Sequence, residues 1–333
     1  MNFRSTLAVT ASLATVFALA GCAPGDAPAG DAAAGDQVSV VASTNVYGQI
    51  AEEIGGDLIE VTSIIDSASQ DPHSFEPSAQ DQLTVTNADL IIENGGGYDA
   101  FVDALIESSG SDAHVLTAAE YSHDYPGNEG HTDDADSAET EEGHDDHASD
   151  EGAPHEHIEG FNEHVWYDPH TIEHAAEAIA GELSELLPDD AATIQKNAEG
   201  FIGQIAELEA SLDEIDAADG GAKVFATEPV PGYLLAAAGL ENVTPEDFSE
   251  AVEEGQDVPP ATLLESLGLL ESGDVRVVIT NTQTGGAETT QIVDDAEARG
   301  IPVIAFSETL PEGQTYISWM QENIAALAGA LAA

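Results

Sequence analysis

Basic side chains are scarce in this chain of 333 residues, which has 5 Lys and Arg against 65 Asp and Glu and a formal net charge of −60 at pH 7. A nucleic-acid-binding surface needs clusters of Lys or Arg that displace counterions from phosphates, so that class of protein is excluded. Docking on anionic lipid through a basic patch is disfavoured for the same reason. The carboxylates favour attraction of cations, and they are equally compatible with adaptation of an exposed protein to high salt.

Cysteine is nearly absent as well. The single Cys22 excludes an internal disulfide framework and a multi-thiolate metal site. Before it, residues 6–20 form an apolar stretch that is too short to span a membrane comfortably and has the layout of an export signal. The Leu-Ala-Gly-Cys sequence that ends this stretch resembles the bacterial lipobox, in which the cysteine is lipidated. A plain signal peptide with a coincidental cysteine is the alternative.

We therefore expect residues 1–21 to be a lipoprotein signal peptide and Cys22 to be the lipidated first residue of the mature chain. Residues 22–37 are rich in Gly, Ala, Pro and Asp, which predicts a disordered leash. No second apolar run of membrane length follows. The expected location is extracytoplasmic, with the protein lipid-anchored to the outer face of the cell membrane.

Short β-rich runs alternate with helical patterns in two parts of the chain. The pattern predicts an α/β fold with two lobes, each a mostly parallel sheet flanked by helices, over residues 38–187 and 219–333. The expected strands are residues 38–42, 59–65, 89–93, 115–116, 223–226, 275–280 and 303–306. The expected helices are residues 46–54, 79–87, 99–107, 233–238, 261–270, 287–299 and 317–331.

One long helix is predicted to join the lobes, over residues 188–218. Pro188 would occupy its first turn, where proline is tolerated. An apolar stripe at helical spacing follows, formed by Ile194, Phe201, Ile205, Leu208, Leu212 and Ile215. A coiled-coil dimer seam is the alternative, but the repeat lasts only about three heptads, so we expect a monomer.

Residues 122–159 have a different composition, with many Asp and Glu and almost nothing apolar. Such a segment cannot build a core and is predicted to be a loop inserted in the first lobe. Histidine-rich tracts are typical of metal binding, so capture or sensing of metal is expected, with a merely solvated acidic loop as the alternative. Six of the chain's 11 histidines lie in this segment: His123, His131, His144, His147, His155 and His157.

Two further histidines lie in segments bounded by proline. His73 lies in residues 70–77, after a predicted strand and before a predicted helix. It would therefore lie at the carboxyl end of the strand, where open α/β sheets bind ligands. His164 lies in residues 162–169, just after the acidic segment. Either histidine alone could be a satisfied structural residue.

Together, the motifs Asp-Pro-His-x-x-Glu-Pro and His-Val-Trp-x-Asp-Pro resemble the solute-binding lipoproteins of zinc and manganese ABC transporters, the cluster A-I family. The Asn-Ala-Asp-Leu-Ile-Ile-Glu-Asn-Gly stretch at residues 87–95 adds to the resemblance, which covers essentially the whole mature chain. It implies two lobes joined by one long helix, a metal bound between them, delivery to an ABC membrane permease and no enzymatic activity.

The same resemblance implies four metal ligands. His73 and His164 are the two histidines, and Glu228 takes the third position, after the first strand of the second lobe. Zinc-type members usually have histidine there, and manganese-type members often have glutamate. Glu308 takes the fourth position, where an aspartate is usual. Two neutral imidazoles and two carboxylates give a net charge of −2, which a divalent cation neutralises.

Zinc is the expected cargo, because the histidine-rich segment resembles that of zinc members. Manganese, or iron, is the alternative cargo. The ligand types do not decide between the metals, because zinc outranks manganese at almost any nitrogen/oxygen site. Metal binding needs neutral imidazoles, and free imidazole titrates near pH 6.5. Affinity is therefore expected to fall as the pH is lowered from about 7.5 to about 5.5.

The remaining candidates are weaker. Glu76, Glu163 and Asp168 could orient the imidazoles, but surface or capping acids are the favoured interpretation. His114, His170 and His174 are expected to be incidental, although the last two lie four residues apart on a predicted helix. An extracytoplasmic metallohydrolase is disfavoured because the sequence has neither His-Glu-x-x-His nor Gly-x-Ser-x-Gly. A metal-binding adhesin or storage lipoprotein stays open.

Overall fold

The structure, a computed structural model, describes residues 37–128, 158 and 160–333. The expected signal peptide and Cys22 lie outside the described residues, as do five histidines of the acidic segment: His131, His144, His147, His155 and His157. None of the helices in the described ranges is long and apolar enough to cross a membrane.

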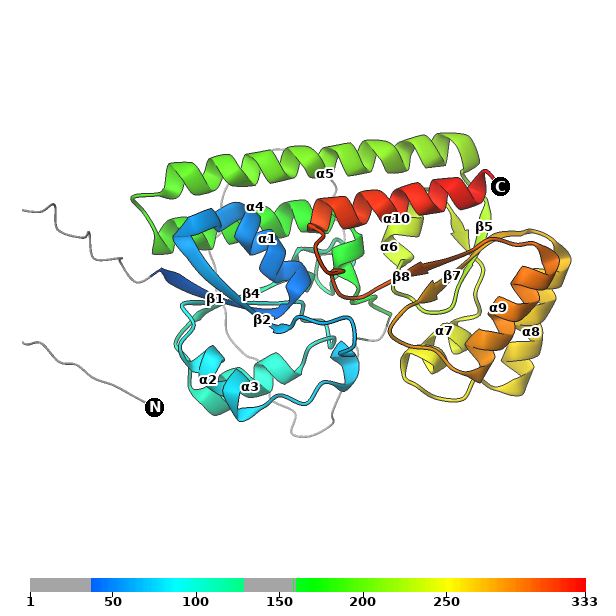
Figure 1. Cartoon of the computed structure of the whole chain (residues 1–333), viewed down its shortest axis with the longest axis horizontal. Coiled ribbons are helices and arrows are strands. Elements are labelled where there is room, and N and C mark those ends of the chain that lie inside the picture. The colour runs from blue at the N-terminus through cyan, green and yellow to red at the C-terminus, as the bar shows by residue number, and fades with distance from the viewer. Residues whose placement is uncertain (1–36, 129–157, 159) are drawn as a thin grey trace, which may run out of the picture. The chain divides into compact units, whose positions relative to one another are not determined.

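Two four-stranded sheets, every pairing of which is parallel, form the framework (Figure 1). Their orders are β2-β1-β3-β4 and β6-β5-β7-β8, so the second sheet repeats the topology of the first. The predicted fold class is confirmed. The strands are β1 Val38–Thr44, β2 Ile59–Ile65, β3 Leu90–Glu93, β4 His114–Thr117, β5 Lys223–Ala226, β6 Glu241–Asn242, β7 Val275–Asn281 and β8 Val303–Phe306.

The helices follow the strands in chain order, as parallel crossovers require. The α-helices are α1 Asn45–Gly55, α2 Ala79–Thr86, α3 Phe101–Ser109, α4 Pro169–Leu186, α5 Ala191–Asp219, α6 Gly232–Ala237, α7 Glu246–Glu253, α8 Pro260–Ser272, α9 Ala287–Arg299 and α10 Tyr316–Leu331. Short 3-10 helices lie at η1 Gly56–Leu58, η2 Pro72–Ser74, η3 Ala118–Tyr121 and η4 Val165–Tyr167.

Helices cover both faces of each sheet, which explains why the strands are apolar almost throughout. In the first sheet, Val41 and Ile91 pack in the core beneath α2 and α3, whereas Val40 belongs to the core on the side of α1 and α4. In the second sheet, Phe225 packs against α7 to α9, and its neighbour Val224 belongs to the opposite core. Each strand therefore sends alternate side chains into two cores.

The long helix α5 lies alongside α4 and α10 (Figure 1). Its predicted stripe is buried from Ile194 to Ile215, and the Phe201 ring lies 5.9 Å from that of Tyr316 in α10. The helix begins at Ala191, after a turn that contains Pro188, so the predicted start at Pro188 is wrong by one turn. Because one apolar cluster includes residues of both sheets and of α5, a shared core restrains motion between the two halves.

The first residues of the predicted acidic loop are part of the fold. Ser122 is fully buried, and the Tyr125 ring lies 5.5 Å from the ring of Phe161. The stretch from Ser122 to Asn128 therefore belongs to the fold, although its composition predicted a loop.

Candidate metal centre

The polar residues singled out by the sequence gather at the carboxyl ends of the strands. In each sheet the second strand pairs with one side of the first strand, and the third strand pairs with the other side. A switch point therefore lies between β1 and β3 and between β5 and β7. Glu228 lies two residues after β5, Asn281 ends β7 and Glu308 lies two residues after β8. Open parallel sheets bind ligands at such positions.

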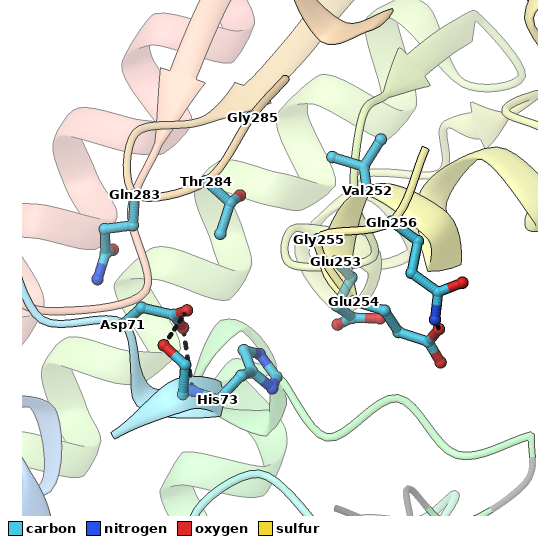
Figure 2. A pocket seen from close by; sticks show the side chains of 11 residues that line it. Asp71, His73, Val252, Glu253, Glu254, Gly255, Gln256, Gln283, Thr284 and Gly285 are labelled. Atoms are coloured by element: carbon cyan, nitrogen blue, oxygen red, sulfur yellow. Dashed lines mark hydrogen bonds between the residues drawn. The ribbon is translucent and has the colours of Figure 1, made fainter. Parts of the chain in front are cut away.

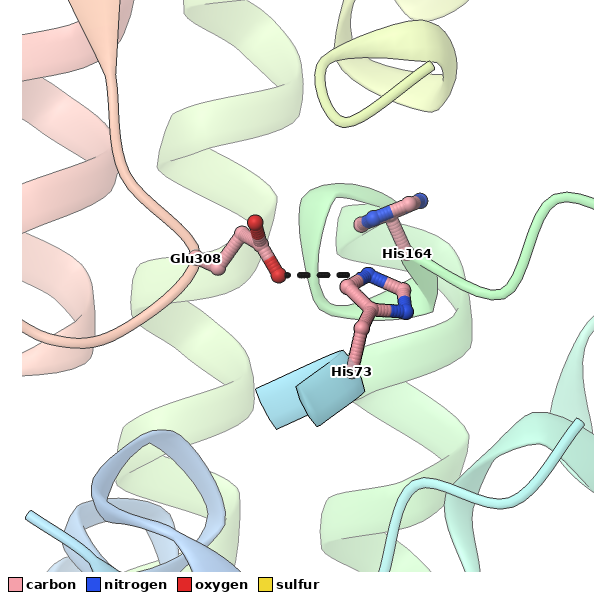
Figure 3. Close-up of side chains that lie close together, drawn as sticks. All are labelled: His73, His164 and Glu308. Carbon is pink, nitrogen blue, oxygen red and sulfur yellow. Dashed lines mark ion pairs between the residues drawn. The ribbon is translucent and has the colours of Figure 1, made fainter. Parts of the chain in front are cut away.

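His73 is held by the short helix η2, which follows β2. Asp71 caps this helix: its carboxylate accepts the His73 backbone N–H at 3.0 Å and the Ser74 hydroxyl at 2.7 Å. Pro72 occupies the first helical position, where a missing N–H costs nothing. The imidazole is thereby directed at Glu308, with 3.5 Å between His73 Nε2 and Glu308 Oε2 (Figure 3).

His164 is held in one tautomer by Asn162. The Asn162 amide accepts the His164 backbone N–H at 3.1 Å and donates to the Pro229 carbonyl at 3.1 Å, which fixes its orientation. Its oxygen then faces His164 Nδ1 at 2.7 Å, so Nδ1 is the protonated nitrogen. The other nitrogen, Nε2, therefore carries a lone pair in the neutral ring and is available to a metal.

Glu308 is 1% exposed and receives donors on both carboxylate oxygens. Asn281 Nδ2 donates to Oε1 at 2.6 Å, and the Tyr98 hydroxyl donates to Oε2 at 3.1 Å. The Gln283 side chain accepts the backbone N–H of Glu308 at 2.6 Å and donates to the Gln70 carbonyl at 3.1 Å. Gln283 thus ties the loop after β8 to the loop that precedes His73.

Tyr98 reaches Glu308 because the chain turns sharply after β3. Gly95 and Gly96 have φ values of 73° and 69°, which favour glycine, and Asp99 accepts the backbone N–H of Gly95 at 2.8 Å. A Cβ atom on Gly95 would lie 2.2 Å from a methyl carbon of Thr117, so a side chain is excluded there. The predicted motif at residues 87–95 therefore serves to place a tyrosine beside the candidate centre.

Glu228 belongs to the same hydrogen-bond network but not to the tightest cluster. His73, His164 and Glu308 bring one ligand atom each to within 4.8 Å of one another (Figure 3). Glu228, 2% exposed, accepts hydrogen bonds from Asn281 at 2.9 Å and from Thr284. Since Asn281 donates to both Glu228 and Glu308, one amide holds the two carboxylates together.

Two further carboxylates lie at the centre, and the sequence did not reveal their place. Glu163 and Glu253 form a second cluster with His73, again within 4.8 Å, and Glu253 Oε1 lies 3.5 Å from His164 Nε2. Glu163 is 3% exposed, so its interpretation as a surface or capping acid is wrong. Glu253 ends α7, a helix that was not predicted, and nothing in the sequence sets it apart among 65 acids.

Burial and charge shift the pKa values at the centre strongly. Burial lowers the pKa of His73, but its hydrogen bond to Glu308 and the charge of Glu308 outweigh burial and raise this pKa to about 9. For Glu308, burial raises the pKa, and the contacts with His73 reverse this, so the pKa is lowered. Without metal, His73 and Glu308 therefore form an ion pair at neutral pH.

Glu253 is shifted in the opposite sense. Burial, followed by the charge of Glu163, raises the pKa of Glu253 to about 9. A protonated Glu253 can donate to the lone pair of His164 Nε2, which agrees with the tautomer that Asn162 imposes. Burial also raises the pKa of Glu228. Protons therefore offset the carboxylate charge where a divalent cation would otherwise do so.

A cavity of about 630 Å³ gives access to His73 (Figure 2). Its walls come from three segments: the η2 region, the end of α7, and the turn after β7. The lining residues are Asp71, His73, Ser74, Val252, Glu253, Glu254, Gly255, Gln256, Gln283, Thr284 and Gly285. Carboxylates on the wall opposite His73 make this cavity attractive to cations.

The other predicted candidates lie elsewhere. Glu76 is exposed, and His114 is an exposed surface residue whose Nδ1 lies 2.6 Å from Glu182. Asp168 is buried at the start of α4 and accepts the Thr171 hydroxyl at 2.5 Å. His170 lies in α4, outside the clusters formed around His73.

Comparison with known proteins identifies the family. The ZnuA family, zinc-uptake complex component A, periplasmic, matches residues 40–330. The chain belongs to this family. The predicted resemblance to solute-binding proteins of zinc and manganese ABC transporters is therefore confirmed, and the chain is a metal-binding substrate-binding protein of this transporter class and not an enzyme.

Individual relatives carry the names of different metals. The manganese ABC transporter substrate-binding lipoprotein PsaA of Streptococcus mitis is 28% identical over 342 residues, with 96% of each chain covered. The zinc-binding lipoprotein AdcA of Streptococcus pneumoniae is 26% identical over 288 residues, covering 84% of this chain and 53% of AdcA. A crystal structure of ZnuA shares the fold, with a TM-score of 0.67 at 19% identity, covering 89% of this chain and all of ZnuA.

Proposed function

We propose that this protein captures zinc outside the cytoplasm and delivers it to the permease of an ABC importer, with His73, His164, Glu228 and Glu308 as the metal ligands. The observation that supports this most directly is the convergence of His73, His164 and Glu308 within 4.8 Å. Imidazole nitrogen and carboxylate oxygen are both good ligands for zinc in a four-coordinate site.

The charge balance supports the same proposal. Glu228 and Glu308 are nearly fully buried, and burial of unpaired carboxylates is costly. No Lys or Arg among the described residues forms an ion pair with either of them. In this part of the chain, Lys223 pairs with Asp274 and Arg299 pairs with Asp295. A divalent cation would replace the proton on His73 and neutralise both carboxylates.

Manganese is the second candidate cargo, and one observation favours it. Glu163 and Glu253 place additional carboxylate oxygens beside His73, and manganese prefers oxygen-rich sites more than zinc does. A centre that recruits either glutamate would therefore suit manganese. The relatives named for zinc and for manganese leave both open.

The membrane arrangement is part of the proposal. A lipid on Cys22 would hold the protein at the outer face of the cell membrane, and the permease would receive the metal from a monomer. Several relatives are named lipoproteins, which supports the anchor. Mass spectrometry of the mature protein tests it: we expect a diacylglyceryl thioether on Cys22, and a Cys22→Ser variant released from the membrane. An unmodified Cys22 in a membrane fraction would contradict the anchor.

Anomalous diffraction tests the ligand set. Crystals of the full chain grown with zinc, and separately with manganese, should show one ion bonded to an imidazole nitrogen of His73 and of His164 and to carboxylate oxygens of Glu228 and Glu308. For zinc the distances should be about 2.0–2.2 Å. An ion bound by Glu253 in place of Glu228 would overturn the assignment. To identify the physiological metal, cells that lack the gene are starved of each metal in turn and their metal content is measured.

A further inference from the structure

A second group of metal-ligating side chains lies on the helices α4 and α5. His170 and Glu173 lie on one face of α4, three residues apart, and Glu209 comes from α5. One ligand atom of each lies within 4.8 Å of the other two. All three side chains are half-buried, and none belongs to the clusters around His73.

Two more imidazoles lie near His170. The His174 ring lies 4.6 Å from the ring of His170, and the His123 ring lies 6.5 Å from the ring of His170. His123 Nδ1 also lies 3.6 Å from Asp168 Oδ2. Two further histidines, from two separate parts of the chain, therefore lie beside His170.

Among the residues that the structure describes, no Lys or Arg forms an ion pair with the carboxylates of this group. Lys196 is the one basic residue of α5, and it lies 13 residues from Glu209, which is about 20 Å along the helix. Of the other three described basic residues, Lys223 pairs with Asp274, Arg299 pairs with Asp295, and Arg276 donates to the Leu331 carbonyl. Burial and the charge of Glu173 raise the pKa of Glu209, while His170 lowers it. The group thus concentrates negative charge, which the His170 imidazole partly offsets.

We propose that His170, Glu173 and Glu209 form a second binding site for a divalent cation of the zinc class, separate from the candidate centre. One neutral imidazole and two carboxylates carry a charge of −2, which such an ion neutralises. His174, beside His170, or water would complete four-coordination. Since the ligands are half-exposed, whereas His164, Glu228 and Glu308 are buried, this site binds zinc more weakly than the candidate centre does.

The sequence alone led to the opposite expectation for His170. A pair of histidines four residues apart on a helix is more often incidental than a metal site, and that was the favoured interpretation. The missing information was Glu209, which is distant in sequence and meets α4 only because α5 packs along it. The packing of α5 along α4 thus brings Glu209 next to His170 and Glu173.

A position-specific experiment tests the proposal, because histidines in other parts of the chain also take up zinc in solution. Crystals of the full chain soaked in zinc should show an anomalous peak bonded to His170, Glu173 and Glu209, besides the peak at the candidate centre. The variants His170→Ala and Glu209→Gln should each lose the first peak and keep the second. His114→Ala, which removes a surface histidine paired with one carboxylate, is the matched control and should keep both.

The proposal is overturned if zinc fills the candidate centre but gives no peak at α4 and α5. It is also overturned if the peak at α4 and α5 survives both His170→Ala and Glu209→Gln. Retention of the peak at the candidate centre shows that each variant is folded. In a zinc titration of the full chain, His170→Ala should weaken the second binding step by at least about tenfold, the lower end of the loss seen when even an outer contact to a metal ligand is removed.

Discussion

The two halves of the protein contribute different chemistry to the candidate centre. The part of the chain before α5 supplies both imidazoles, and the part after it supplies Glu228 and Glu308. The imidazoles are directed by local contacts, since Asp71 holds His73 and Asn162 holds His164. The carboxylates are instead held by a shared network, in which the single amide of Asn281 donates to both.

This difference follows from charge. The neutral imidazole of His164 can be buried with a hydrogen bond to Asn162, whereas two carboxylates in the same half repel each other and need several donors. Before metal arrives, the charge of Glu308 is also balanced across the two halves, by the proton on His73. Each half alone is therefore an incomplete site.

Removal of a ligand should have the largest effect and should be equally severe in either half. His164→Ala and Glu308→Ala are each expected to weaken zinc binding by more than about 100-fold, beyond the range seen for outer contacts. Competition with a chromophoric chelator measures this. His114→Ala is the control and should bind zinc as the wild type does. A mild loss for Glu308→Ala alone would show that Glu163 or Glu253 takes its place.

A change of pH should have the second-largest effect on zinc affinity, through the half that supplies the imidazoles. Because the pKa of His73 is raised to about 9, zinc must displace a proton throughout the neutral range. Zinc affinity should rise about tenfold per pH unit, or about 100-fold from pH 6.5 to pH 8.5. The expectation from free imidazole was a rise that ends near pH 7.5. Titration calorimetry at several pH values distinguishes the two, and a plateau above pH 7.5 would contradict the raised pKa.

Stability of the metal-free protein should change with pH in the opposite direction. A raised pKa means that the contribution of the His73–Glu308 pair is complete below about pH 6.5, the unfolded value, and is lost as the pH rises through about 9. The difference in melting temperature between the wild type and His73→Gln should therefore be largest near pH 6.5 and disappear above about pH 9. Saturating zinc should abolish this pH dependence.

Loss of a supporting amide should have an intermediate effect that differs between the halves. Asn281→Ala frees two carboxylates at once, and Asn162→Ala frees one imidazole. We expect losses of zinc affinity of about 10- to 100-fold, the greater for Asn281→Ala. Asn197→Ala, which removes an amide that bonds the Ile54 carbonyl away from the centre, is the control. Equal losses for both variants would show that the shared network has no special importance.

The sequence predicted the framework well because local patterns decide it. Buried parallel strands are continuous apolar runs and α5 has a regular stripe, so both could be located, and the motifs around His73 and His164 identified the family. The two-residue β6 has no such pattern, and α7 has only Phe248 and Val252 as buried residues. These elements were therefore missed.

The candidate centre was predictable only where a motif or strand end marks it. Glu228 and Glu308 were assigned through the family resemblance, which expects ligands just after β5 and β8. Asn281 ends a strand but has no motif, and Glu253 lies on the missed helix α7. Contacts such as that between Glu253 and His164 depend on how α7 packs, and no local pattern encodes that. For the same reason Glu209 was not foreseen beside His170.

Glu253→Gln should have the smallest effect on zinc affinity. With its pKa raised to about 9, Glu253 is a neutral acid at pH 7, so glutamine preserves its shape and can still donate to His164 Nε2. We expect affinity at pH 7 to change by no more than about twofold, the size of an ordinary mild substitution. A loss as large as that of Glu308→Ala would instead make Glu253 a metal ligand that ionises when metal binds. The variant should also stabilise the metal-free protein, because the wild type must protonate a buried carboxyl on folding. This advantage should be absent below about pH 4.5, where the unfolded carboxyl is protonated too, and should grow until about pH 9. Thermal unfolding of both proteins across this range measures it, and Glu182→Gln, which alters an acid at the surface beside His114, controls for the general loss of negative charge.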